Sequence, residues 1–468
     1  MTQPFPHDPF LTGPAAPSGI ECDAPDLIIE GELPADLQGV YFRNGPDPLY
    51  PPREGDQYHW FHGDGMIQRF EFSEGRVAWK NRWVRTEKYE LERAAGKSLF
   101  GVLGNPLTGD PAVSDEHYNT ANTHIVWHGG KLLALMEGTI AVEMQPDTLA
   151  TVGNFNYEGQ IDGPITAHPK FDHASGEMVF FGAQAKGPMT EFLRMNVADR
   201  HGKLIKNEMV EAPFASFAHD FFVTENYVVF PVYPLAFNLE RAMQGGIPMA
   251  WEPDRGTHLG VMPRQGTAKD VVWHTMEPRW SFHMVNAWEE GGEIKVDVCA
   301  SNASNFAPKL DGRMATSEEG LRPLLRRWSL DTTGNTATVG EEILDDMSGE
   351  FPRTDDRFMT RCHRHAFLVG GAGENLIFNR LLHYDMQTGT RKMWGDDRYF
   401  LGEPVLAPRS AAADEADGYL LTLAYDRDTA LTDLLILDAS DVEAGPMARA
   451  KLPVRIPSGF HGTWVGSS

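Results

Sequence analysis

The chain has 468 residues, a formal net charge of −25 and a pI near 5.0, with 41% hydrophobic and 23% charged residues. This composition is typical of a globular enzyme. The acidic balance argues against a nucleic-acid partner and against purely electrostatic binding to anionic lipid, because both need clustered Lys and Arg. Cys22, Cys299 and Cys362 are far apart and odd in number, which favours a reducing compartment. With no signal-peptide pattern and no long apolar run, we expect a soluble, cytoplasmic protein without a transmembrane segment.

Taken in chain order, the sequence predicts β structure almost throughout. Residues 1–25 are rich in proline and predict an extended arm, and residues 26–468 a single catalytic domain. Runs of β-branched and aromatic residues then alternate with Gly, Asn and Asp, which is the pattern of strands and hairpins. Such hairpins are predicted for 125–127 with 132–135, 221–223 with 227–230, 285–288 with 294–298, 366–369 with 376–378, and 419–423 with 434–437. Helical patterns are confined to 239–245 and 317–327.

The spacing of the hairpins favours a β-propeller. It is too regular, and the chain is too long, for a single β-sandwich. A propeller closes a series of small sheets around an axis, and its inner strands converge on that axis. Trp-Asp and kelch repeats are absent, so this prediction depends on spacing rather than on a repeated motif.

Four histidines stand where a predicted strand begins or ends, each beside small or apolar residues: His168, His219, His283 and His461. The first three are spaced by 51 and 64 residues, as one ligand per repeat would be. Four neutral imidazoles suit zinc, copper, nickel or iron, and the spacing does not select among them. Taken singly, each histidine is more typical of a hydrogen-bonded strand end than of a metal ligand.

Three glutamates lie in apolar settings where an unpartnered carboxylate would be costly: Glu137, Glu350 and Glu403. Metal-bound histidines usually donate their second ring N–H to a carboxylate or a carbonyl, which fixes the tautomer. Three carboxylates would also offset the charge of a divalent metal held by neutral ligands. The alternative for each, and most of all for Glu350 and Glu403 beside Gly and Pro, is a surface turn.

A series of short motifs runs along the chain in a fixed order. They are Tyr-Phe-Arg-Asn-Gly-Pro at 41–46, Trp-Phe-His-Gly-Asp-Gly-Met at 60–66, Ala-Asn-Thr at 121–123, Ala-His-Pro-Lys-Phe-Asp at 167–172, His-Asp-Phe at 219–221, Trp-Glu-Pro at 251–253, Phe-His-Met-Val-Asn-Ala-Trp-Glu at 282–289, Phe-Pro-Arg at 351–353, Gly-Glu-Pro at 402–404 and Phe-His-Gly at 460–462. Together, over more than four hundred residues, they resemble the carotenoid cleavage oxygenase family. That family includes enzymes that cleave carotenoids, apocarotenoids, lignostilbenes and isoeugenol.

The resemblance implies an all-β, seven-bladed propeller with Fe(II) on its axis and a dome of loops over one face. Its ligands match His168, His219, His283 and His461; the glutamates that hydrogen-bond them match Glu137, Glu350 and Glu403; and a threonine that restricts access to the open coordination position matches Thr123. The dome would enclose an apolar tunnel. The implied enzyme is an Fe(II)-dependent dioxygenase whose partners are O2 and a hydrophobic alkene, which it cleaves at a carbon–carbon double bond to give two carbonyl products.

Three positions bear on the substrate. The middle of the chain is most similar to the bacterial stilbene and isoeugenol branch, in which a tyrosine and a lysine hold a 4-hydroxyl group. The matching positions here are Leu103 and Met136, while the branch's stacking aromatic residue is retained as Phe61. A buried phenol without hydrogen-bond partners costs about 1–3 kcal/mol. These residues therefore favour an apolar conjugated alkene, with an apocarotenoid first and a stilbene or phenylpropenoid as the alternative.

Other readings stay open. An isomerase of the same fold is a further alternative, and a non-catalytic propeller that binds partners is the least consistent with the histidines and glutamates. The apolar residues 233–237 fit a core strand end, or else a tunnel mouth with a weak peripheral membrane contact. The sequence gives no indication of the oligomeric state.

Overall fold

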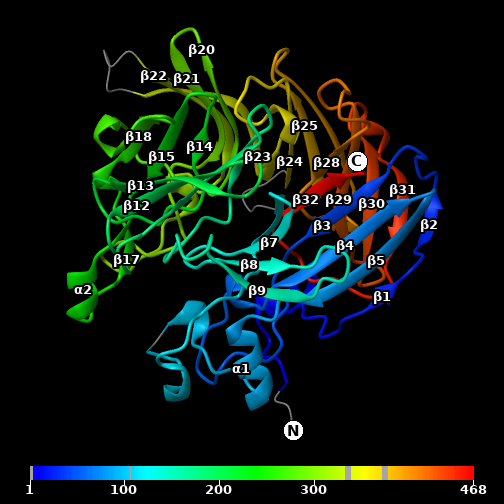
Figure 1. The fold of residues 1–468 in the computed structure, drawn as a ribbon, viewed down its shortest axis with the longest axis horizontal. Helices are drawn as coiled ribbons and strands as arrows, with labels where there is room; N and C mark the ends of the chain where they lie inside the picture. The colour runs from blue at the N-terminus through cyan, green and yellow to red at the C-terminus, as the bar shows by residue number, and fades with distance from the viewer. Residues whose placement is uncertain (1–3, 106, 333–338, 372–377, 468) are drawn as a thin grey trace. The chain divides into compact units, whose positions relative to one another are not determined.

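The computed structural model describes residues 4–105, 107–332, 339–371 and 378–467 (Figure 1). The chain forms two compact units: unit 1 comprises Met1–Asp162 and Gly395–Ser468, and unit 2 comprises Gly163–Trp394. Within the described residues the α-helices are α1 (Glu87–Ala95) and α2 (Leu239–Met243), whereas strands occur throughout. The prediction of an almost all-β chain is confirmed. Whether residues 26–468 act as one domain behind an arm at 1–25 stays a prediction.

The described residues of unit 1 form three antiparallel sheets. The strands, in the order in which they lie side by side, are β1 (Asp23–Ala24), β5 (Arg76–Trp83), β4 (Met66–Ser73), β3 (Gly39–Arg43) and β32 (Gly462–Gly466); then β6 (His124–His128), β7 (Lys131–Leu135), β8 (Ala141–Met144) and β9 (Thr151–Phe155); then β2 (Ile28–Gly31), β31 (Pro446–Lys451), β30 (Leu431–Asp438), β29 (Gly418–Asp426) and β27 (Tyr399–Leu401), with β28 (Val405–Pro408) also on β29. Two of these sheets join the ends of the chain, because β3 pairs with β32 and β2 with β31. Their shared core contains Tyr41, Phe70, Trp79 and Ile436.

In the part of unit 2 that the structure describes there are four further sheets. Their strands, in spatial order, are β10 (Lys170–Asp172), β11 (Glu177–Gly182), β12 (Phe192–Ala198) and β13 (Leu204–Glu211); then β14 (Phe222–Val223), β15 (Tyr227–Val232), β18 (Thr257–Pro263) and β19 (Val272–Met276); then β16 (Leu235–Phe237) and β17 (Met249–Trp251); then β20 (Met284–Glu290), β21 (Glu293–Ala300), β22 (Leu324–Asp331), β23 (Val339–Arg353), β24 (His365–Gly371), β25 (Arg380–Asp385) and β26 (Thr390–Gly395). Four of the five predicted hairpins are present as the antiparallel pairs β6–β7, β14–β15, β20–β21 and β29–β30. The second strand of the fifth, 376–378, lies largely outside the described residues, and β24 pairs with β25.

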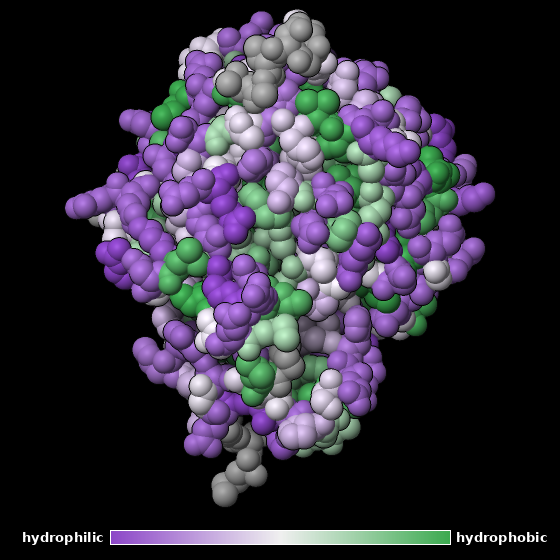
Figure 2. All heavy atoms as spheres, turned by 90° about the vertical axis from the view of Figure 1, so that its left-hand side faces the viewer, coloured by the Kyte–Doolittle hydropathy of each residue, from purple (hydrophilic) through white to green (hydrophobic). Residues whose placement is uncertain are grey.

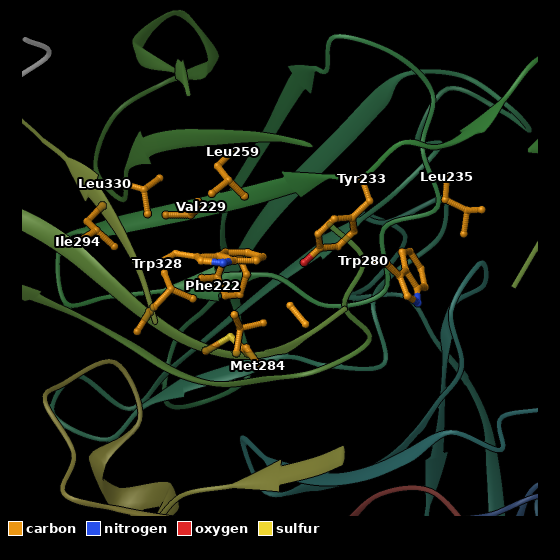
Figure 3. Close-up of a cluster of buried hydrophobic side chains, with 14 of the residues drawn as sticks. Phe222, Val229, Tyr233, Leu235, Leu259, Trp280, Met284, Ile294, Trp328 and Leu330 are labelled. Atoms are coloured by element: carbon orange, nitrogen blue, oxygen red, sulfur yellow. The ribbon is translucent and has the colours of Figure 1, made fainter. Parts of the chain in front are cut away.

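A large apolar core of unit 2 lies under the strands that follow two of the candidate histidines (Figure 3). Phe222 on β14 packs edge-on against Trp328 on β22, with ring centroids 6.0 Å apart, and Met284 at the start of β20 belongs to the same core. Burying aromatic side chains of this size removes a large apolar area from water and dominates the local packing energy. The starts of β14 and β20 are therefore held by the core rather than by loops.

The helices test the sequence patterns. The prediction at 239–245 is confirmed by α2, whose first turn is capped by the Asn238 side chain. The prediction at 317–327 is wrong: a single 3-10 turn at Ser317–Glu319 ends at Gly320, which adopts φ +82°, and β22 follows. The 3-10 turns are Pro9–Leu11, Gly13–Ala15, Trp60–His62, Val102–Gly104, Pro111–Val113, Pro253–Arg255, Ala268–Asp270, Ser317–Glu319, Asp356–Phe358 and Val442–Ala444.

The face drawn in Figure 2 is mostly hydrophilic, with hydrophobic residues in scattered areas between hydrophilic ones. Among the described residues, no helix combines the length and the apolar character needed to cross a bilayer. In the apolar stretch 233–237, Tyr233, Leu235 and Ala236 are at most 2% exposed. This stretch therefore forms a core strand end of unit 2.

Candidate metal centre

Three of the four candidate histidines lie together in unit 2, each at the end of a loop that leads into a strand. His168 stands two residues before β10, His219 three residues before β14, and His283 directly before β20. All three are at most 9% exposed. Thr166 links the first two loops, because its hydroxyl accepts the His168 N–H at 2.9 Å and donates to the His219 carbonyl at 3.3 Å.

The three imidazoles form a compact cluster, called here the three-histidine cluster. The ring centroids of His168 and His219 are 4.4 Å apart, those of His168 and His283 5.1 Å, and those of His219 and His283 4.9 Å. The Nε2 atoms of His219 and His283 lie 3.1 Å from each other. Each ring offers one nitrogen, and these nitrogens lie within 4.8 Å of one another. Such spacing suits nitrogens that share one metal ion.

Glu350 on β23 fixes the orientation of His283. Its Oε2 lies 2.5 Å from Nδ1 of His283 and also accepts the Phe351 N–H at 2.8 Å. The Phe351 ring stacks on His283 with centroids 5.3 Å apart. With Nδ1 donating to the carboxylate, Nε2 of His283 keeps its lone pair for another partner. This carboxylate is buried, at 6% exposure for the residue.

In unit 1, His461 has an equivalent carboxylate partner. It directly precedes β32, and its Nδ1 lies 2.8 Å from Oε1 of Glu403, while Oε2 of Glu403 accepts the Gly462 N–H at 2.9 Å. Glu403 is 1% exposed, so it is a buried group and not a surface turn. The His461 N–H donates to the Thr123 carbonyl at 3.1 Å. Two of the candidate histidines, one in each unit, thus carry a buried glutamate on Nδ1.

The remaining candidates of unit 1 differ in their surroundings. Phe61 packs edge-on against Phe460, with centroids 5.4 Å apart, and so lies beside the segment that carries His461. Met136 and Glu137 follow β7 and are half-buried. Leu103 is 46% exposed, adopts φ +56° and donates its N–H to Nδ1 of His62 at 3.2 Å. Burial lowers the pKa of His62 well below its usual value, so this ring is neutral and accepts the bond.

An aromatic group of unit 2 borders the three-histidine cluster, and its members were not predicted as site residues. Its members, called here the aromatic cage, are Phe217, Trp280, Phe282 and Phe306. The Phe217 ring is stacked with His219 at 6.4 Å, and the Phe282 ring stands edge-on to His219 at 5.1 Å. Trp280 lies beside Tyr233 in the core (Figure 3). The one sequence signal was that Phe217 and Phe282 flank two candidate histidines.

Comparisons with known proteins agree with this geometry. The family model described as retinal pigment epithelial membrane protein matches residues 15–466. Isoeugenol monooxygenase of Pseudomonas nitroreducens is 37% identical over 472 residues, covering 98% of each chain. The crystal structure of Pseudomonas brassicacearum lignostilbene dioxygenase superposes with a TM-score of 0.95 at 37% identity over 100% of both chains, and a variant of Synechocystis apocarotenoid oxygenase with 0.84 at 30% identity over 96% of both.

The chain belongs to the carotenoid cleavage oxygenase family. It is an enzyme, an oxygenase of that family, and the seven-bladed propeller implied by the motifs is confirmed as its fold. Family members depend on a metal, and the donor set of unit 2 fits one: three buried imidazoles converge, and His283 is fixed by a carboxylate on the opposite ring nitrogen. On softness alone these donors suit Fe(II), zinc, copper or nickel.

Proposed function

We propose that this oxygenase cleaves the side-chain double bond of a stilbene or phenylpropenoid with O2, giving two carbonyl products. Leu103 and Met136 favour an apocarotenoid. The relatives of similar sequence, however, are named for isoeugenol and lignostilbene, and they favour the aryl alkene. The observation that carries the proposal is the aromatic cage beside the three-histidine cluster. Its rings lie 5.0–5.9 Å apart in neighbouring pairs, and we propose that the planar aryl group of the substrate stacks on them.

We assign Fe(II) as the resident metal, with His168, His219 and His283 as ligands and His461 as the fourth. Neutral imidazole nitrogens are donors that suit iron. When bound, the iron activates O2 for addition to the alkene. Thr123 is assigned to restrict access beside His461, and Phe61, Leu103 and Met136 to line the substrate pocket.

The residues of the chain position the reactants. Glu350 holds the Nδ1 proton of His283, and Glu403 that of His461, so that both rings present Nε2 with its lone pair. We assign Glu137 to the same task. The cage orients the aryl ring and excludes water, so that the double bond is held near the metal in a reactive arrangement. Each carbonyl product receives one oxygen atom of O2, and no cosubstrate is needed.

Product analysis tests the proposal. The Fe(II)-loaded protein is given 4-hydroxystilbene, isoeugenol and an apocarotenal in parallel under 18O2. The products are separated by chromatography, and their 18O content is measured by mass spectrometry. We expect labelled aromatic aldehyde from the first two substrates. Cleavage of the apocarotenal alone would contradict the aryl-alkene proposal, and an unlabelled isomer as the sole product would support the isomerase alternative instead.

The cage has its own test. Phe282→Leu removes an aromatic ring beside His219 while keeping an apolar side chain. An aromatic contact contributes about 0.5–1.5 kcal/mol beyond its buried area, so KM for the aryl alkene should rise about two- to tenfold. Phe367→Leu in β24 is the control, because its ring packs on His383 rather than on a candidate ligand. Equal increases in KM for Phe282→Leu and Phe367→Leu would show that the aromatic cage does not bind the aryl group of the substrate.

A further inference from the structure

A buried ion pair in unit 2 connects all three segments that carry the three-histidine cluster. Lys170 follows His168 by two residues, and its Nζ lies 2.5 Å from Oδ1 of Asp220, which follows His219 directly. The second carboxylate oxygen, Oδ2, accepts the N–H of Met284, the residue after His283, at 3.1 Å. The carboxylate of Asp220, which is itself next to His219, therefore contacts Lys170, two residues after His168, and Met284, directly after His283.

The pair is almost entirely removed from water. The Lys170 and Asp220 side chains are 8% and 7% exposed. Oδ1 of Asp220 also accepts the Phe221 N–H at 2.8 Å, so both oxygens have defined partners. The Lys170 ammonium lies 5.8 Å from the centre of the Phe221 ring. The groups that contact the Asp220 carboxylate therefore lie at or next to the first residues of β10, β14 and β20, and the direction of each strand is set by its sheet.

Such a pair is a poor way to stabilise a fold. Moving two charges out of water costs several kcal/mol per ion, and well-packed apolar residues of similar volume are often at least as stable. The pair instead fixes the relative positions of the three segments. A carboxylate that is bonded to a buried ammonium and to two backbone N–H donors tolerates little displacement of the segments that carry these groups. A shift between these segments would move the imidazoles apart.

We propose that the Lys170–Asp220 pair positions the three imidazoles, so that the cluster is spaced for a metal before the metal binds. This inference rests on the proposed function, since it takes the cluster to be a metal centre. Lys170 and Asp220 are positioning residues that touch neither the metal nor the substrate. The competing explanation is that the pair serves only the charge balance of the core of unit 2.

Unit 1 offers a matched control. Lys88 and Asp64 form a pair of the same residue types, with Nζ 2.8 Å from Oδ1 and side chains 2% and 3% exposed. Asp64 accepts the Leu49 N–H and Lys88 also contacts Glu92, and neither residue is near a candidate ligand in the sequence. Loss of this pair should cost stability alone.

The experiment compares K170M, D220N and the double variant K170M/D220N with K88M and D64N, all in the full chain. Co2+ affinity is measured by competition with a chelator, and the midpoint of thermal unfolding is measured on the metal-free proteins. We expect K170M and D220N to bind Co2+ at least tenfold more weakly and to unfold at lower temperature. The double variant should regain most of the lost midpoint, because no unpaired charge stays buried, but not the affinity. K88M and D64N should lower the midpoint and leave the Co2+ affinity within about twofold.

Each outcome decides between the two explanations. Recovery of both midpoint and affinity in the double variant would assign the pair to charge balance and overturn the inference, as would equal losses of affinity in K88M and K170M. If K170M or D220N does not fold, the Co2+ affinity of the double variant K170M/D220N is compared directly with that of the unaltered protein. Failure of the unaltered protein to bind Co2+ would instead overturn the metal centre, and with it the proposed function, independently of the ion pair.

Discussion

Asp47→Asn should remove a pH-dependent loss of stability from unit 1. Asp47 is fully buried, and its carboxylate accepts the Ser18 N–H at 3.0 Å and contacts the Ser18 hydroxyl. Burial raises the pKa of Asp47 from 3.8 to about 6, against the opposing effect of the Ser18 hydrogen bonds, and the nearby Asp64 charge adds to the rise. The folded state therefore binds this proton more tightly than the unfolded chain does.

The sign and size follow from linkage. Between about pH 4 and pH 6 the folded state holds a proton that the unfolded state has released, so the free energy of unfolding falls as the pH rises through this window and stays lower above it. A rise from 3.8 to about 6 corresponds to about 3 kcal/mol at about 1.4 kcal/mol per pKa unit. The asparagine variant has no such proton, and its stability relative to the parent should therefore increase by about 2.5 kcal/mol between pH 4 and pH 8, because the unfolded carboxyl is already partly ionised at pH 4.

Urea denaturation of both proteins at each pH from 4 to 8, followed by tryptophan fluorescence, measures this difference directly. Ser18→Ala is the control of opposite direction, because losing a hydrogen bond to the ionised carboxylate raises the pKa further and moves the decline to higher pH. A constant difference in stability between the parent and Asp47→Asn across the whole range would refute the reasoning.

Three further results are expected. Glu350→Gln should lower metal affinity about 10- to 100-fold, measured by metal content after dialysis against a graded chelator, because the carboxylate that orients His283 is lost; an unchanged content would speak against His283 as a ligand. Lys88→Met should lower the free energy of unfolding by about 3–5 kcal/mol in urea, because two buried carboxylates lose their cation; a loss below 1 kcal/mol would show that water reaches the pair. Leu103→Tyr combined with Met136→Lys should raise kcat/KM for 4-hydroxystilbene relative to 4-methoxystilbene about tenfold, since a buried phenol gains partners; an unchanged ratio would place the two positions outside the pocket.

Local patterns predicted the local structure where neighbours in the sequence decide it. The run 125–135 forms β6 and β7 because its apolar strands are joined by Gly129 and Gly130, both with positive φ. The same kind of signal was present for α1, where Thr86 caps the first turn and Gly96 ends the helix at φ +67°, yet the helix was not predicted. Its polar sequence has little helical periodicity, since the buried residues include Lys88 and Glu92, which pair with each other.

The residues of the candidate site also differ in whether the sequence could predict them. The histidines and glutamates could be named from motifs, and the hydrogen bonds of Glu350 and Glu403 to His283 and His461 agree with those assignments. The aromatic cage could not, because Phe217 and Phe306 meet only through packing between distant loops. Lys170 and Asp220 lie within two of the family motifs, but the motifs do not predict that the two residues pair. Contacts between side chains that are far apart in the sequence produce no periodic pattern from which they could be predicted.

His461 lies where the two ends of the chain pair. His461 directly precedes β32, which pairs with β3 near the N-terminus. Asn44, next to β3, donates its N–H to the His461 carbonyl and accepts the Phe460 N–H, each at 2.9 Å. The buried Arg43 guanidinium donates to the carbonyls of Glu403 and Gly459 at 3.1 and 3.2 Å. The proposed fourth ligand and its carboxylate are thus held by residues from the opposite end of the sequence.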